Sequence, residues 1–128
     1  MGNKAKILHI EDNPDSRLLV RRILQADGFT VLEASNAEQA LELLRDQIPN
    51  LIIMDINMPE VDGYTLTKKL KAMPELSRVP IIAMTAYALR GDRERSLAAG
   101  CDGYIQKPLN IDQLIREVER FLPRRTHA

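Results

Sequence analysis

Short apolar runs alternate with longer segments in which apolar residues recur every three to four positions. The apolar runs predict five strands, at residues 5–10, 30–33, 51–54, 80–84 and 103–106. The third and fourth runs, LIIM and PIIAM, show no polar alternation, which is typical of strands buried on both faces. The intervening segments carry apolar residues at the spacing of amphipathic helices.

Signals for helix ends divide these segments. Asn13 caps the first helix, with Pro14 in its first turn, and Gly28 ends it. Asn36 and Gln39 come close to a capping box for the second helix. Asp62-Gly63 opens the third helix, and Asn110 caps the last one. The fourth helix, near 92–99, consists mostly of charged residues and alanine, which predicts loose packing.

Strands that alternate with helices indicate a parallel sheet covered on both faces, with right-handed crossovers. Five such units fit an α/β, doubly wound, flavodoxin-like fold with five helices and the strand order 2-1-3-4-5. In that order, ligands bind beyond the carboxyl ends of the strands, where the winding direction reverses between the first and third strands. We therefore looked for chemistry at the strand ends.

Composition narrows the class of protein. The 128 residues predict one domain, 1–128 with a core of about 4–123, without an attached output domain. No apolar run approaches the roughly 20 residues of a membrane helix, and there is no signal peptide, so we expect a cytoplasmic protein without membrane insertion. Eighteen basic and eighteen acidic residues cancel, which gives no indication of nucleic-acid binding. The lone Cys101 has no disulfide partner in the chain.

Three carboxylates are predicted to meet at the reversal point. Glu11 and Asp12 end the first strand and Asp55 ends the third. Carboxylates in one crevice repel each other unless a cation neutralises them. Because the donors are all oxygens, with no Cys or His, they favour a hard ion, and so sparse a site suits Mg²⁺, which keeps several of its waters.

The ends of the last two strands match a phosphoryl group. Thr85 offers a hydroxyl donor, and Lys107 offers an ammonium that can act as a point charge on phosphate. Each residue alone is weak, because a strand-end threonine is usually a strand former and a lone lysine a solvated charge. The ordered set of acidic pair, aspartate, threonine and lysine is much harder to explain by chance.

These motifs together resemble a known family. The stretches KILHIEDNPDSR, LIIMDINMPEVDGY, IIAMTAYA and GCDGYIQKPL, in this order, resemble the CheY-like receiver domains of response regulators in two-component signalling. The resemblance covers essentially the whole chain. It implies a Mg²⁺-dependent reaction in which Asp55 takes a phosphoryl group from a histidine kinase or a histidine phosphotransfer protein. Such a domain is no enzyme beyond its own phosphorylation and dephosphorylation.

The resemblance also assigns roles to individual residues. It implies that Glu11, Asp12, Asp55 and the backbone carbonyl of Asn57 hold the Mg²⁺. It further implies that Thr85 and Lys107 bind the phosphoryl oxygens.

Two further features follow from the same resemblance. Tyr104 would be an aromatic switch that acts with Thr85 and changes the surface of the helix near 92–99, the strand 103–106 and the last helix for a downstream protein target. The Lys107–Pro108 peptide bond would be cis.

Two rival functions fit the residues less well. A haloacid dehalogenase-type phosphatase needs a second aspartate two residues after the first, where this chain has Asn57. A flavin-binding module needs a glycine- and hydroxyl-rich loop after the first strand, and EDNPDS is acidic without glycine. The stretch TAYALRGDRER resembles both stand-alone regulators related to DivK and receivers of hybrid kinases, and this choice stays open. His9 is interpreted as a packed strand histidine rather than a phosphoacceptor.

Overall fold

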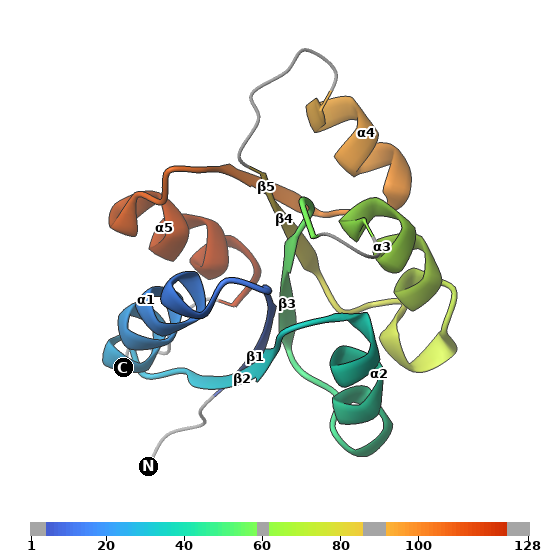
Figure 1. Cartoon of the computed structure of the whole chain (residues 1–128), viewed down its shortest axis with the longest axis horizontal. Coiled ribbons are helices and arrows are strands. Elements are labelled where there is room, and N and C mark those ends of the chain that lie inside the picture. The colour runs from blue at the N-terminus through green and yellow to red at the C-terminus, as the bar shows by residue number, and fades with distance from the viewer. Residues whose placement is uncertain (1–4, 59–61, 86–91, 123–128) are drawn as a thin grey trace.

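Strands and helices alternate along the whole of the chain that is described (Figure 1). In the computed structural model, residues 5–58, 62–85 and 92–122 are described. The strands are β1 Lys6–Ile10, β2 Thr30–Ala34, β3 Leu51–Asp55, β4 Ile81–Thr85 and β5 Gly103–Gln106. The helices are α1 Pro14–Ala26, α2 Ala37–Asp46, α3 Gly63–Lys71, the short 3₁₀ helix η1 Pro74–Leu76, α4 Asp92–Ala99 and α5 Ile111–Phe121.

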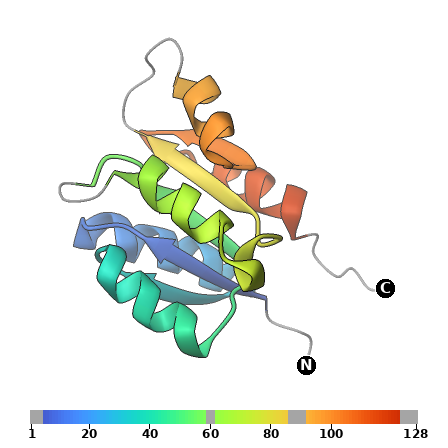
Figure 2. The same ribbon diagram turned by 90° about the vertical axis from the view of Figure 1, so that its right-hand side faces the viewer.

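The five strands form one parallel sheet in the order β2-β1-β3-β4-β5, which confirms the predicted topology. Helices α1 and α5 lie on one face of the sheet and α2, α3 and α4 on the other (Figure 1). The arrowheads of the blue β1 and the yellow β4 point to the same edge (Figure 2). All five carboxyl ends therefore meet at that edge.

Each face of the sheet has its own apolar core. Alternate residues of β3 point to opposite faces, so Ile53 packs with α1 and α5 while Ile52 packs with α2 and α3. All five residues of β3 are buried, as expected of the central strand. Burial on both sides holds the end of β3 rigidly, and the strand ends on Asp55.

Side-chain caps begin the helices where the sequence predicts. The side chains of Asn13, Asn36, Asp62 and Asn110 each accept a hydrogen bond from the first turn of the following helix. The second helix differs in one detail. The Gln39 Oε1 accepts a hydrogen bond from the Ser35 N–H at 2.7 Å, so the reciprocal half of the predicted capping box lies one residue earlier.

The predicted strand ends differ from the observed ones by one residue at most. Ladder pairing with β4 extends β3 through Asp55, which faces Met84. In α4, the described side chains bury only Ser96 and Ala99, both small, and Leu97 is half exposed. Within the described ranges, no helix is long and apolar enough to cross a membrane. The terminal residues of the predicted domain, 1–4 and 123–128, lie outside the described part.

Candidate functional site at the carboxyl ends of the strands

Three carboxylates converge where β1 and β3 end. Glu11, Asp12 and Asp55 each place one carboxylate oxygen within 4.8 Å of the others. Glu11 and Asp55 are nearly fully buried, at 1% and 2% exposure, whereas Asp12 is exposed. The predicted acidic cluster is thus assembled, with two members held by the sheet and one facing solvent.

The cluster carries more negative charge than its surroundings balance. Burial and the charge of Asp55 raise the pKa of Glu11 to about 7, against a smaller lowering by Lys107. The Lys107 Nζ lies 3.2 Å from Glu11 Oε1 and 3.5 Å from Asp55 Oδ1. Burial lowers the pKa of Lys107, but the two carboxylates outweigh burial and raise it. Lys107 contacts two of the three carboxylates, so a bound cation could neutralise further negative charge in the cluster.

Backbone groups fix the two buried carboxylates. The Asn57 N–H donates to Asp55 Oδ1 at 3.1 Å, and the Asn13 N–H donates to Glu11 Oε2 at 3.3 Å. The Arg17 guanidinium donates to the Glu11 carbonyl at 2.7 Å and so ties α1 to the end of β1. The contact made by Arg17 was not predicted, because only the helical turn after Asn13 brings it back over residue 11.

The ends of β4 and β5 complete the edge. The Thr85 hydroxyl is buried and donates to Asn57 Oδ1 at 3.2 Å. The Lys107 N–H donates to the Thr85 carbonyl at 2.7 Å, which joins the two strand ends. The Lys107–Pro108 peptide bond is cis, as expected. Thr85 and Lys107 therefore lie beside the acidic cluster, as the sequence predicts.

Tyr104 lies further from the carboxylates. It pairs in register with Ala83 on β4, two residues before Thr85. Tyr104 and Thr85 therefore share the face covered by α2 and α3, where Tyr104 is half-buried against the apolar core.

Gly63 sets the approach of α3 to the site, a role that the sequence did not reveal. A Cβ at Gly63 would lie 2.7 Å from the Asp55 carbonyl oxygen and 2.8 Å from the Ile56 Cα. Its N–H donates to the Ile56 carbonyl at 3.1 Å. Only a glycine lets the first turn of α3 come this close to the end of β3. The motif Asp62-Gly63 predicted the helix start but not this contact.

His9 lies directly beneath the carboxylates. It is fully buried, and neither ring nitrogen has a hydrogen-bond partner among the described residues. Burial, with Lys107 and Arg17, lowers its pKa to about 3, so the ring is neutral. Its Nε2 stands 4.0 Å from Glu11 Oε1, and a neutral ring makes this a packing contact rather than an ion pair. This agrees with a packed strand histidine.

Comparison with known proteins decides the family. The model of the response regulator receiver domain matches residues 7–119. The chain belongs to the response regulator receiver family. It is 40% identical over 116 residues to the polar-differentiation response regulator DivK of Brucella anthropi, which covers 91% of this chain and 94% of that protein.

Solved receiver structures superpose closely. The receiver domain of the sensor histidine kinase PA1611 from Pseudomonas aeruginosa, determined with magnesium in its active-site cleft, has a TM-score of 0.85 and 36% identity, covering 95% of this chain and all of that one. The chemotaxis protein CheY4 of Vibrio cholerae has a TM-score of 0.88 and 27% identity, covering 93% and 99%. This protein is therefore a receiver domain of two-component signalling with a DivK-like sequence, and not a classical enzyme.

Proposed function

We propose that Asp55 is the phosphoacceptor of this receiver and takes its phosphoryl group from a histidine kinase or a histidine phosphotransfer protein. One observation carries the proposal. Asp55 is a buried carboxylate at the end of a rigid strand, with Lys107 at 3.5 Å and two further carboxylates in reach. A nucleophile for in-line attack needs such fixed geometry.

The residues of the chain account for each part of the transfer. An Asp55 carboxylate oxygen attacks phosphorus, and the P–N bond of the phosphohistidine breaks with its electron pair passing to the imidazole nitrogen, which takes up a proton. The hydrogen bond from Asn57 N–H to Asp55 Oδ1 orients the carboxylate. Lys107 and the Thr85 hydroxyl would bind the phosphoryl oxygens by charge-assisted hydrogen bonds.

A divalent metal fits the acidic cluster. The donors are carboxylate oxygens, and the pKa of Glu11 is raised to about 7 by burial and by repulsion from Asp55, which a cation would relieve. Glu11, Asp12, Asp55 and the backbone carbonyl of Asn57 would hold Mg²⁺. When bound, the ion would offset the negative charge that builds up as phosphate approaches a carboxylate.

Signal output is proposed to follow from the Thr85 hydroxyl. If Thr85 turns from Asn57 toward a phosphoryl group on Asp55, it vacates space on the face that it shares with Tyr104. The Tyr104 ring would turn inward and change the surface of α4, β5 and α5 for a downstream protein target. Phosphotransfer from the histidine kinase or histidine phosphotransfer protein proposed above implies that the domain acts in the cytoplasm.

Phosphorylation in vitro tests the proposal. Acetyl phosphate with Mg²⁺ should add one phosphoryl group, sensitive to alkali and hydroxylamine, measured by intact-protein mass spectrometry. Asp55→Asn should abolish the addition, whereas Asp46→Asn, an exposed aspartate at the end of α2, should retain it. Full labelling of Asp55→Asn would disprove the assignment of Asp55.

A further inference from the structure

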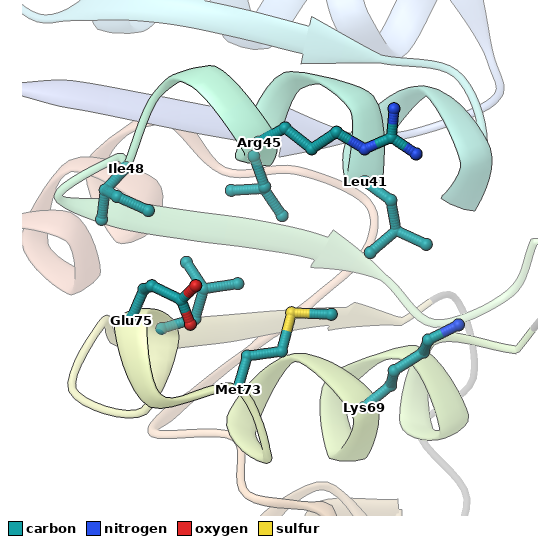
Figure 3. A pocket seen from close by; sticks show the side chains of 8 residues that line it. Leu41, Arg45, Ile48, Lys69, Met73 and Glu75 are labelled. Atoms are coloured by element: carbon teal, nitrogen blue, oxygen red, sulfur yellow. The ribbon is translucent and has the colours of Figure 1, made fainter.

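An apolar groove separates α2 from the end of α3 and η1 (Figure 3). Its volume is about 340 Å³. Leu41 and Leu44 of α2 line one wall, and Met73 and Leu76 line the other. Ile48, which follows α2, forms part of the rim and is 47% exposed, one of the large apolar side chains left open to solvent. The surface therefore offers an apolar strip between two helices.

Charged side chains mark the two ends of this groove. The Arg45 guanidinium, from α2, and the Lys69 ammonium, from α3, extend toward the same end, while Glu75 lies at the other end beside Ile48 (Figure 3). Throughout residues 5–58, 62–85 and 92–122, none of the three forms an ion pair with another side chain. The groove is thus positive at one end, apolar along its length and negative at the other end.

The groove lies away from the phosphoacceptor. Helix α2 ends at Asp46, just before β3 begins at Leu51, and η1 comes just before β4 begins. Asp55 is at the opposite end of β3, four residues further on, which is about 13 Å at 3.3 Å per residue. A molecule in the groove would leave the phosphoacceptor accessible.

We propose that this groove binds an amphipathic helix of a partner protein. The helix would lay apolar residues at spacings of three, four and seven along the strip, with an acidic side chain toward Arg45 and Lys69 and a basic side chain toward Glu75. From Leu41 to the end of α2 at Asp46 the strip is about 8 Å long at 1.5 Å per residue, and Ile48, beyond the helix, extends it to on the order of two helical turns. Opposite charges at the two ends favour a peptide over a fatty-acid-like anion, which would use only the positive end.

A pair of designed peptides tests the proposal. The first, of about 14 residues, carries an apolar stripe with glutamates at one end and lysines two turns away. The second has only these charges exchanged, and the termini of both peptides are blocked. Binding of each to the full chain is followed by amide and methyl chemical shifts. We expect the shifts to fall on Leu41, Ile48, Met73 and Leu76.

Charge reversal distinguishes a specific docking site from nonspecific hydrophobic binding. The double variant Arg45→Glu/Lys69→Glu, exposed at both positions, should lose at least tenfold in affinity for peptides that orient their glutamates toward the positive end. Adding Glu75→Lys to the double variant should restore the affinity, with the peptide lying in the groove in the opposite direction. A spin label at one end of the peptide measures this direction. The matched control Arg22→Glu/Lys68→Glu changes the net charge equally on other exposed positions and should bind like wild type.

The outcomes separate this proposal from the phosphoacceptor assignment. Shifts outside the groove, no binding by either peptide, or equal affinity of the double variant Arg45→Glu/Lys69→Glu and the control variant would overturn the docking surface. Labelling by acetyl phosphate, measured in the same variants, should stay at the wild-type level. Loss of labelling in every protein would instead count against Asp55 and leave the peptide result standing.

Discussion

His9 lies near the end of β1 and Glu11 directly after it, two residues apart, and burial shifts their pKa values in opposite directions. Burial beside Asp55 raises the pKa of Glu11 to about 7, whereas burial lowers the pKa of His9 to about 3. In both cases burial disfavours the charged form, which is the anion of a carboxyl and the cation of an imidazole. Each shift makes a separate prediction about pH.

Mg²⁺ binding should strengthen as pH rises. Below pH 7 the Glu11 carboxyl is mostly protonated and must lose its proton to bind the ion, so affinity should rise about fivefold from pH 6 to pH 7 and about twofold more by pH 8, where it levels off. Calorimetric titration at constant ionic strength measures this. In Glu11→Gln the affinity should be weaker and nearly independent of pH. A wild-type affinity that is the same at pH 6 and pH 8 would contradict the role of Glu11.

His9 should make the fold sensitive to acid. Its folded pKa lies below the unfolded value of 6.5, so its contribution to stability is complete above pH 6.5 and is lost as pH falls toward 3. Because the ring nitrogens have no described partners, His9→Leu should be tolerated near pH 7. Urea unfolding measures this. Relative to wild type, the free energy of unfolding of His9→Leu should increase by on the order of a few kcal/mol as pH falls from 6.5 to 4. A constant difference across that range would exclude a buried neutral His9.

At the scale of elements, the contact of α3 with the end of β3 depends on one missing side chain. Gly63→Ala would place a Cβ 2.7 Å from the Asp55 carbonyl, so α3 must move away from the strand that carries Asp55. We expect a loss of about 1–3 kcal/mol in the free energy of unfolding and slower phosphorylation by acetyl phosphate.

Gly28→Ala provides the comparison. Gly28 has a φ of +96° but nothing within 4 Å of an added Cβ, so alanine there strains only the backbone. It should lower stability and leave the phosphorylation rate unchanged. If Gly63→Ala phosphorylates at the wild-type rate, then α3 does not position the site.

Elements were predictable where local pattern and burial agree. The short apolar runs placed every strand to within one residue at either end, and Asn13, Asn36 and Asn110 marked helix starts. The strand order then brought Glu11 and Asp55 together. Contacts that depend on how elements dock were not predictable, such as Arg17 over the Glu11 carbonyl and Gly63 against Asp55. Spacing along the chain carries no information on such distances.

Across the whole molecule, the two proposed surfaces occupy different parts of the sheet. The proposed phosphoacceptor lies at the carboxyl ends of the strands, and the proposed output surface lies beside it on α4, β5 and α5. The groove between α2 and α3 lies toward the amino ends of the strands. Helix α4 packs on the protein through the small buried side chains of Ser96 and Ala99, which bury little apolar area. Moving α4 should therefore require little free energy.

The switch predicts where the molecule responds to activation. Beryllofluoride with Mg²⁺, a stable mimic of the phosphoryl group, should shift amide resonances in α4, β5 and the start of α5, together with the ring resonances of Tyr104. The amides of α1 and α2 should move much less. In Thr85→Ala the response at Tyr104 should disappear while the adduct still forms. A Tyr104 ring that stays unchanged in the wild-type adduct would rule this switch out.

Mapping the phosphorylated residue tests the central claim most directly. After reaction with acetyl phosphate and Mg²⁺, borohydride reduction converts an aspartyl phosphate to homoserine, which tandem mass spectrometry can place in the sequence. We predict homoserine at position 55 alone, and none in a sample treated without acetyl phosphate. Reduction at Glu11 or Asp12 in place of Asp55 would contradict the account.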